Sequence, residues 1–294
     1  KGKQPVKTRI ITSVVGLCFL ALVLSMFNTI VLDLVVAALC LLGVHEAFAA
    51  FGFKTSQLYL YAPFVPFTIL VMLSHGSAAR AVLLPAAFVF MLYLCVCVIL
   101  KHRTVDVAKL SGFVCLSGLM MLCFYSLVEL KRLLPYETYH YDAVFFVLLA
   151  LCYAWGGDSA AYFTGRFLGR HKLAPEVSPN KTIEGAIGGV CGSVLLGVLA
   201  TWIYSTLANR LEMFTAGRVS GKLYLLIALM GAVASVLGIL GDLFASAVKR
   251  QCGIKDYGSI FPGHGGILDR FDSVMFIAPF VTIVVRWVFY AYQA

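Results

Sequence analysis

The sequence predicts an all-α integral membrane protein that crosses the bilayer about nine times. Of its 294 residues, 61% are hydrophobic and only 13% are charged, whereas soluble domains carry about 25% charged residues. The mean hydropathy is +0.92. Most of the apolar stretches are hydrophobic on all sides of a helix, whereas a helix of a soluble bundle keeps a polar face. These observations exclude a soluble globular protein and favour a polytopic helical one.

Nine apolar stretches come close to the ~20 residues that a helix needs to cross a membrane. The first stretch follows a basic segment, as the apolar part of a signal peptide would. It is too long for a signal peptide, however, and no small-residue cleavage site follows it. The third is the shortest and contains Pro63 and Pro66. The expected spans are residues 10–27, 30–51, 58–74, 81–100, 107–130, 143–165, 184–204, 222–249 and 273–292.

Positive charges are divided unevenly between the loops that join these spans. If the N-terminus lies inside, sixteen of the 23 Lys and Arg residues fall inside and six outside, with Arg286 within the last span. This bias predicts a cytoplasmic N-terminus and an external C-terminus. It also accounts for the net charge of +9 without a nucleic-acid partner, because no basic stripe is interleaved with aromatic residues. Residues 166–181 and 249–272 are both expected in the cytoplasm.

The two parts of the chain differ in how many polar residues their apolar stretches contain, and no linker sequence separates them. Residues 1–140 read as plain N-terminal membrane helices, and residues 141–294 as a catalytic membrane region with cytoplasmic loops. Asp33, His45 and Glu46 are polar exceptions in the first part. For His45 and Glu46, a hydrogen bond at a helix end or between helices is favoured over a direct role.

The most polar stretch of the second part runs from Gly241 to Asp272. Its first polar residues recur at helical spacing and so share one helix face; they are Asp242, Ser246, Lys249 and Arg250. The glycine-rich segment 261–266, FPGHGG, cannot be helical throughout, and its backbone is open to a close ligand, as in loops that cradle phosphates. Asp269 and Asp272 follow, three positions apart and therefore expected on one side of the next helix.

This stretch mixes both signs of charge within about thirty residues. Its acids are Asp242, Asp256, Asp269 and Asp272; its bases are Lys249, Arg250, Lys255 and Arg270; and it contains His264. Carboxylate oxygens suit Mg²⁺, and cations suit phosphate oxygens, so the mixture favours a metal with a polyphosphate. The alternative is a solvated loop, but such a loop gives no reason for Asp242 and Ser246 to stand among apolar residues.

Two further polar segments precede this stretch. Asp158 lies in WGGDSxAY, residues 155–162, and an ionisable residue in a membrane span is a functional candidate. Residues 178–185 read SPNKTIEG, where Thr182 is a plausible helix N-cap and Lys181 adds positive charge to a natural anion site. The alternative for Lys181 is a positive-inside signal alone. Glycines at 185 and 189, and at 188 and 192, are expected to let another helix pack closely.

The spacing of these residues is similar to a known family. Ser246-x-Val248-Lys249-Arg250, then Lys255-Asp256, then His264-Gly265-Gly266-x-x-Asp269-Arg270-x-Asp272 resembles the signature of phosphatidate cytidylyltransferases, also called CDP-diacylglycerol synthases. The SPNKTIEG segment and the region of Asp158 resemble a second segment of that family. The resemblance is weak before about residue 140 and strong after it.

The resemblance implies an enzyme that condenses CTP and phosphatidate to CDP-diacylglycerol and pyrophosphate. It implies Mg²⁺, with Mn²⁺ as an alternative and a monovalent cation as a further candidate. The implied metal ligands are Asp242 and Asp269, with Asp272 and Asp158 next in line. The implied catalytic residues are Asp242, Asp269, Lys249, Arg250, His264 and Arg270, where His264 either donates to a phosphate or protonates the leaving group. The implied substrate-binding residues are Lys181, Ser178, Glu184, Ser246, Lys255, Asp256, Gly265, Gly266 and Asp158.

The same resemblance places the protein in the bacterial inner membrane, among membrane lipids. Its active site is expected to face the cytoplasm, where a nucleoside triphosphate is available, and a homodimer is left open. A CTP-dependent polyprenol or phytol kinase is one alternative, and the complete motif argues against it. A transporter is the other, but transporters usually show two similar halves, whereas the polar residues here crowd into the second part.

Overall fold

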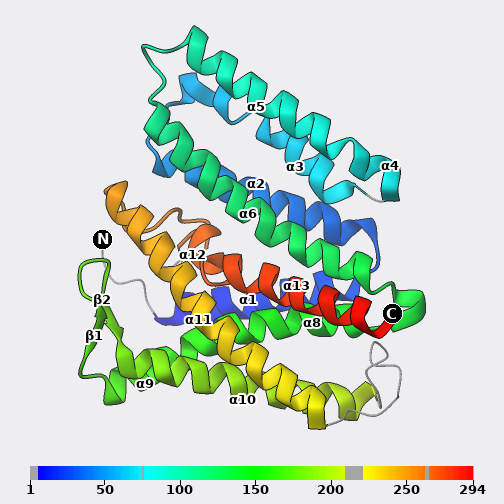
Figure 1. Ribbon diagram of the computed structural model, residues 1–294. Coiled ribbons are helices and arrows are strands. Elements are labelled where there is room, and N and C mark those ends of the chain that lie inside the picture. Colours follow the sequence, from blue (N-terminus) through cyan, green and yellow to red (C-terminus); the bar gives the residue numbers. More distant parts are fainter. Residues whose placement is uncertain (1–5, 75, 209–220, 262–264, 294) are drawn as a thin grey trace. The chain divides into compact units, whose positions relative to one another are not determined.

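The computed structural model describes residues 6–74, 76–208, 221–261 and 265–293, and these residues are predominantly helical (Figure 1). In the first part of the chain the helices are α1 (Val6–Ser25), α2 (Ile30–Ala50), the 3₁₀ helix η1 (Thr55–Leu60), α3 (Phe64–Leu73), α4 (Gly76–Ala81), α5 (Leu83–Leu100) and α6 (Val107–Leu133). They are followed by α7 (Tyr136–Tyr139), α8 (Asp142–Leu151), the π-helical turn η2 (Cys152–Gly156), α9 (Gly157–Leu168), the strands β1 (Lys172–Ala174) and β2 (Ser178–Thr182), α10 (Ile183–Ala208), α11 (Gly221–Gln251), α12 (Leu268–Phe271) and α13 (Val274–Gln293).

Seven helical segments of the described residues are long and apolar enough to cross a membrane. They are Ile30–Ala50, Thr55–Leu73, Ala79–Leu100, Val107–Leu133, Asp142–Leu168, Ile183–Leu207 and Gly221–Gln251, with shorter apolar helices at Ile11–Ser25 and Val274–Val288. The prediction of an all-α, multi-pass membrane protein is confirmed. The number of nine spans stays a prediction. The antiparallel hairpin β1–β2 is an addition that the hydropathy pattern did not predict.

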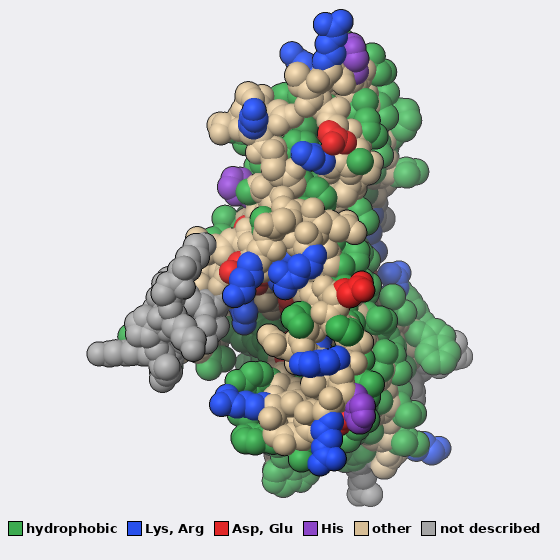
Figure 2. Space-filling model, turned by 90° about the vertical axis from the view of Figure 1, so that its left-hand side faces the viewer, with side chains coloured by type: hydrophobic (Ala, Val, Ile, Leu, Met, Phe, Trp, Pro, Cys, Tyr) green, Lys and Arg blue, Asp and Glu red, His purple; other side chains and the backbone are tan. Residues whose placement is uncertain are grey.

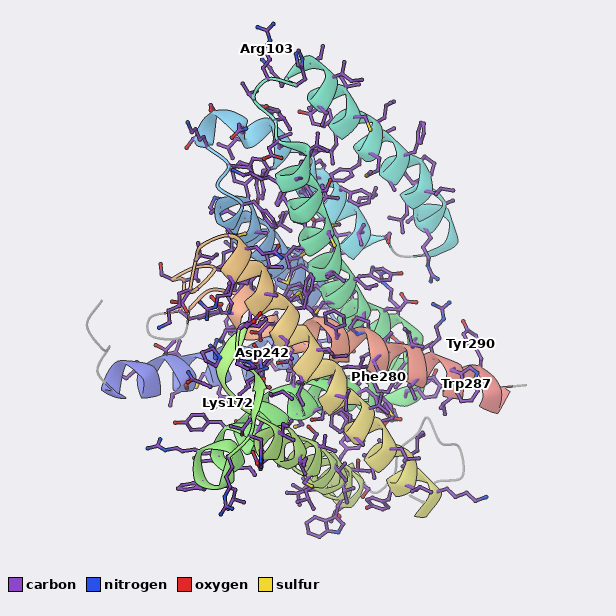
Figure 3. All side chains as sticks on the ribbon, turned by 60° about the vertical axis from the view of Figure 1, so that its left-hand side comes forward. Arg103, Lys172, Asp242, Phe280, Trp287 and Tyr290 are labelled. Atoms are coloured by element: carbon purple, nitrogen blue, oxygen red, sulfur yellow. The ribbon has the colours of Figure 1, made fainter. Side chains whose placement is uncertain are left out.

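The helices carry broad hydrophobic surfaces (Figure 2). Leu84 of α5 and Leu207 of α10 are each 80% exposed, as expected for side chains that face lipid tails rather than water. Trp287 and Tyr290 lie near the C-terminal end of α13 (Figure 3) and are 74% and 53% exposed. Aromatic residues of this amphipathic kind gather where a span meets the membrane–water interface.

The chain packs into two compact units. The first comprises Lys1–Val128 with Gln251–Arg270, and the second comprises Glu129–Arg250 with Phe271–Ala294. The sequence placed a boundary at residue 140 and assigned all of 251–270 to the second part. In the structure, Gln251–Arg270 packs with the first unit, and Glu46 of α2 accepts hydrogen bonds from its backbone, as described below.

The first unit is built around an aromatic core. Phe64 of α3 contacts Phe90 of α5 and Phe113 of α6, with ring centroids 4.8 and 4.9 Å apart. Phe48 of α2 meets Phe113 edge to face at 5.8 Å. Aromatic pairs in such geometry add to the stabilisation from burial alone, so these rings hold the four helices together.

The second unit depends on close helix packing. A Cβ at Gly188 would overlap Thr164, and a Cβ at Gly192 would overlap Ala160, so the predicted role of these glycines in the contact between α9 and α10 is confirmed. Small residues let helix backbones approach each other in membranes. The expected single span 143–165 is a continuous helical segment from Asp142 to Leu168 whose middle is the π-helical turn η2.

Candidate active site

The C-terminal part of α11 presents the predicted polar face. Ser246 Oγ donates a hydrogen bond to Asp242 Oδ1 at 3.2 Å, which is possible because residues four apart lie on one side of a helix. Lys249 and Arg250 follow in the last turn of α11. Ser246 is buried, with 9% of its surface exposed. Because α11 contains all four residues at the predicted spacing, the prediction that they share one helix face is confirmed.

The hairpin β1–β2 brings a second charge to this face. Lys181 Nζ of β2 lies 2.6 Å from Asp242 Oδ2, and the two side chains are 23% and 25% exposed. Figure 3 shows Asp242 on α11 and Lys172 on the hairpin in the same region of the second unit. The hairpin is tied to α11 a second time, since Arg250 Nε donates to the carbonyl oxygen of Val177 at 3.3 Å.

The start of α10 fixes the hairpin from its other end. Thr182 Oγ1 accepts a hydrogen bond from Gly185 N at 3.1 Å, so the predicted N-cap is confirmed. Glu184 accepts hydrogen bonds from the backbone N–H groups of Arg170 and His171 at 3.0 and 3.2 Å. The ring Nδ1 of His171 lies 2.6 Å from Glu184 Oε1. Glu184 therefore holds the hairpin in place, and Ser178 lies at the start of β2.

Two more carboxylates lie in the second unit. Ser273 links them: its Oγ donates to Asp158 Oδ2 at 2.8 Å, and its backbone N–H donates to Asp272 Oδ1 at 2.9 Å. Burial, and then the negative charges of Asp242 and Asp158, raise the pKa of Asp272 to about 7, against a smaller opposing effect of Lys249. Burial is therefore the main cause of the raised pKa, and the two neighbouring acids add to it.

A glycine on α11 allows this approach. A Cβ at Gly241 would lie 2.5 Å from the carbonyl oxygen of Asp272, closer than any side chain could be placed without moving the backbone. The absence of a side chain at Gly241 thus lets α11 pass directly beside the segment that precedes α13. Asp272 was expected on the same helix as Asp269, which is wrong: α12 ends at Phe271, and α13 begins at Val274.

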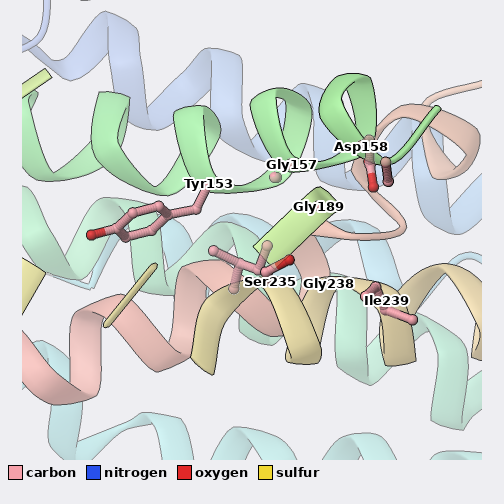
Figure 4. A pocket seen from close by; sticks show the side chains of 10 residues that line it. Tyr153, Gly157, Asp158, Gly189, Ser235, Gly238 and Ile239 are labelled. Carbon is pink, nitrogen blue, oxygen red and sulfur yellow. The ribbon is translucent and has the colours of Figure 1, made fainter. Parts of the chain in front are cut away.

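A small, partly open pocket lies beside Asp158. It is lined by residues of η2, α9, α10, α11 and α13, and Figure 4 shows Asp158 and Ser235 among the polar groups on its wall. Tyr153 shapes one side, because its hydroxyl donates to Ile227 O of α11 at 2.7 Å and its carbonyl oxygen accepts from Ser193 Oγ of α10 at 2.9 Å. The π turn that contains Tyr153 widens the helix locally.

The other predicted site residues belong to the first unit. Lys255, Asp256 and Arg270 are exposed. Gly265 has φ +85°, a conformation that favours glycine, and its carbonyl oxygen accepts from Phe261 N at 2.9 Å. The N–H of Gly266 donates a hydrogen bond to Asp269 at 3.0 Å, so this group stabilises the loop. His264 lies outside the described residues.

Asp269 holds backbone groups of its own unit. Its Oδ2 accepts hydrogen bonds from Tyr257 N at 2.8 Å and Gly266 N at 3.0 Å, and its exposure is 9%. Asp242 and Asp269 belong to different units, so their predicted meeting at one metal ion stays a prediction. Among the described residues, no group of three His, Cys, Asp or Glu side chains is arranged to hold a metal ion.

One residue of this region was given no direct role from the sequence. Glu46 of α2 accepts hydrogen bonds from Ile267 N and Leu268 N, directly beside the glycine-rich segment. The sequence favoured a hydrogen bond at a helix end or between helices, and Glu46 does bond to the end of another helix. The available signal was a carboxylate within an otherwise apolar span, which requires a partner.

Comparison with known proteins identifies a family and several relatives that this chain resembles. The profile of a family described as the cytidylyltransferase family matches residues 7–288. A phosphatidate cytidylyltransferase of Bacillus subtilis (strain 168) is 42% identical over 171 residues, covering 58% of this chain and 56% of that protein. A phosphatidate cytidylyltransferase of Staphylococcus epidermidis (RP62A) is 43% identical over 149 residues, covering 51% and 52%. The chain thus spans about half the length of the curated relatives it matches.

Proposed function

Because the chain belongs to the cytidylyltransferase family, we propose that it transfers the cytidylyl group of CTP to phosphatidate. The products are CDP-diacylglycerol and pyrophosphate. The relatives that share 42% and 43% identity carry the name phosphatidate cytidylyltransferase. The observation in the structure that carries the proposal is the convergence of Lys181, Asp242 and Asp272 in the second unit, since the reaction needs both cations and carboxylates.

The reaction joins two polyanions. A phosphate oxygen of phosphatidate attacks the α-phosphorus of CTP, a new P–O bond forms, and the bond from the α-phosphorus to the bridging oxygen breaks. The electron pair of that bond leaves with pyrophosphate. Because the attacking oxygen is already anionic at neutral pH, the reaction needs no strong general base. Its rate depends on positioning and on electrostatic stabilisation of the phosphates.

The cations of the second unit are suited to this task. Lys181 and Arg250 lie where the hairpin meets α11. The positive charge of Lys249 lowers the pKa of Asp272, against the larger effects that raise it. Ammonium and guanidinium groups form strong, charge-assisted hydrogen bonds with phosphate oxygens. We assign Lys181, Lys249 and Arg250 to the phosphates. The resemblance also implies phosphate contacts for Lys255 and Arg270, which belong to the first unit. A role for His264 in donating a proton or a hydrogen bond remains part of the proposal.

A divalent cation fits the chemistry of the carboxylates in the second unit. Asp158, Asp242 and Asp272 offer hard oxygen donors, which Mg²⁺ prefers. Burial, and then the negative charges of Asp242 and Asp158, raise the pKa of Asp272, so a bound cation would favour its charged form. At Asp242 the ammonium group of Lys181 already supplies a positive charge. When bound, Mg²⁺ or Mn²⁺ would neutralise charge on the phosphates and the leaving pyrophosphate. Asp242 and Asp272 would hold it, with Asp158 as a further ligand; the resemblance also implies this role for Asp269, which belongs to the first unit.

The proposed substrates also explain why this chemistry takes place in a membrane protein. Phosphatidate is anchored in the bilayer by its acyl chains, so its headgroup meets CTP at the membrane surface. We propose the bacterial plasma membrane, with the hairpin β1–β2 and the C-terminal end of α11 in the cytoplasm. The positive-inside bias supports this orientation, and the contact between Lys181 and Asp242 supports one common side for both segments.

Labelled CTP tests the proposal and separates it from its alternatives. Purified protein is incubated with phosphatidate vesicles, Mg²⁺ and CTP that carries the label on either the α- or the γ-phosphorus, and the lipids are then extracted. We expect the α-label in the lipid and the γ-label in pyrophosphate. A γ-label in the lipid would indicate a CTP-dependent lipid kinase instead. A lipid fraction that contains neither label would contradict the proposed enzyme.

A further inference from the structure

Glu46 reaches from α2 to the backbone just before α12. Its Oε1 accepts a hydrogen bond from Ile267 N at 3.0 Å, and its Oε2 accepts one from Leu268 N at 2.9 Å, across 221 and 222 positions of the sequence. The residue is 4% exposed. Both oxygens of one buried carboxyl group are therefore occupied by two consecutive backbone N–H groups.

The backbone around this carboxylate leaves no room for further side chains. A Cβ at Gly258 would overlap Glu46 Oε1, and a Cβ at Gly266 would overlap both carboxylate oxygens. Two separate glycines thus pass directly over the same carboxylate. This close passage requires glycine for space, whereas Gly265 requires it for its backbone conformation, with φ +85°.

Asp269 completes the support from within the segment. Its Oδ2 accepts the N–H groups of Tyr257 and Gly266, and Glu46 accepts the next two, of Ile267 and Leu268. These two carboxyl groups thus accept four backbone N–H groups of the segment, those of Tyr257, Gly266, Ile267 and Leu268. A buried N–H that loses its acceptor destabilises the local structure.

We propose that Glu46 is a positioning residue of the proposed cytidylyl transfer. It holds the backbone of residues 265–268 and so sets the positions of Gly265, Asp269 and Arg270, which the proposed reaction assigns to substrate and metal. Its two oxygens are committed to backbone N–H groups, so it acts through the segment rather than on the substrate. The inference rests on the proposed function for its kinetic consequence, but its structural consequence can be measured separately.

The central test compares Glu46→Gln with Asp33→Asn. Glutamine keeps the size of the side chain but replaces one acceptor oxygen with an N–H donor, which faces a backbone donor. Asp33 is a buried acid on the same helix, so its variant controls for the loss of a buried charge on α2. Two properties are measured in detergent: amide hydrogen exchange of residues 255–270, and the kcat and KM for CTP of the folded fraction isolated by size exclusion.

We expect Glu46→Gln to exchange faster at residues 265–268, with unchanged exchange in α5 and α10. Its kcat should fall about 10- to 100-fold, as for a displaced active-site group, while the KM for CTP changes by less than about threefold. Asp33→Asn should match the parent in both properties. A purely structural Glu46 would lower the yield of folded protein and leave the kcat of the folded fraction intact, and this result would overturn the inference.

Gly258→Ala provides an independent approach if Glu46→Gln does not fold. The added methyl group overlaps Glu46 Oε1, so this variant should lower kcat in the same way. Glu46→Asp shortens the acid and makes room for the methyl group. We therefore expect the double variant Glu46→Asp, Gly258→Ala to lose less activity than the product of the two single losses, which is the sign of direct coupling. Losses that multiply independently, or single variants with the parent's kcat and exchange, would refute the inference.

The two proposals can fail separately. If the parent protein forms no CDP-diacylglycerol, the proposed function is wrong, and hydrogen exchange alone still tests whether Glu46 holds residues 265–268. If the parent is active and Glu46→Gln has the same exchange and the same kcat, the proposed function stands and the role of Glu46 is wrong.

Discussion

Lys181 Nζ lies 2.6 Å from Asp242 Oδ2, and this ion pair joins the hairpin β1–β2 to α11. The two residues were predicted for different partners, the lysine for a phosphate and the aspartate for a metal ion. In the structure each provides the counter-charge of the other, with about a quarter of each side chain exposed. A phosphate and a divalent cation would together replace both halves of this pair without leaving an unbalanced charge.

We expect Lys181→Ala to lower kcat/KM. The loss of one charge-assisted contact to a phosphate should cost about 1.5–3 kcal/mol of binding or transition-state stabilisation. Steady-state kinetics with CTP and phosphatidate measure this effect. Lys172→Ala is the matched control, because Lys172 lies on the neighbouring strand and its Nζ donates to the carbonyl oxygen of Pro179 at 2.6 Å. Equal kinetic constants in the parent and Lys181→Ala would leave Lys181 with only a topological role.

Asp242→Asn and Asp269→Asn should fail in different ways. Asp242 is the carboxylate assigned to the metal. The variant Asp242→Asn should therefore abolish turnover and the response to Mg²⁺, and leave the melting temperature nearly unchanged. Asp269 Oδ2 accepts hydrogen bonds from two backbone N–H groups. The variant Asp269→Asn should therefore also destabilise the first unit, by about 1–3 kcal/mol.

Thermal unfolding in detergent and Mg²⁺ titration of activity distinguish these two effects. Each variant serves as the control of the other, because both changes remove one negative charge and keep the shape of the side chain. An active Asp242→Asn with the parent's Mg²⁺ dependence would contradict the metal role. A fully stable Asp269→Asn would show that its hydrogen bonds to Tyr257 and Gly266 contribute little.

Gly241→Ala should disturb Asp272. The new Cβ would lie 2.5 Å from the carbonyl oxygen of Asp272, so α11 and the segment before α13 must separate, and overpacking of this kind costs about 1–3 kcal/mol. Activity should fall more than stability alone explains, since Asp272 is displaced as well. Gly221→Ala on the same helix is the control, because its Cβ meets nothing within 4 Å. Parent-like activity in Gly241→Ala would show that the separation is harmless.

Cysteine labelling tests the orientation of the protein. Arg103→Cys and Arg170→Cys lie in segments predicted to be cytoplasmic, and Arg80→Cys in a segment predicted to be external; all three positions are exposed. An impermeant maleimide added to intact cells should label only Arg80→Cys above the background of the parent's own cysteines. Permeabilised cells should show labelling at all three positions. Labelling of Arg170→Cys in intact cells would invert the proposed topology.

Local pattern and composition were sufficient for the class of fold and for several elements. The predominance of long apolar stretches predicted a multi-pass helical protein, because a helix satisfies its backbone hydrogen bonds within one segment, as lipid requires. The polar face of α11 and the N-cap at Thr182 were predicted correctly. Both depend on residues within about four positions of one another, where the helix repeat fixes which side chains meet. The signature motif of residues 246–272 indicated the family through its resemblance to a known pattern.

The tertiary structure decided which distant groups meet. Nothing near Asp242 in the sequence indicates Lys181 as its partner, and nothing near Glu46 indicates the amides of Ile267 and Leu268. The assignment of Gln251–Arg270 to the first unit also follows from such contacts, whereas the hydropathy of the segment grouped it with its neighbours in the chain. Contacts of this kind depend on how helices pack, and helix packing depends on the shapes of whole surfaces. A periodic pattern determines which face of a helix is polar, but only the folded chain determines what that face touches.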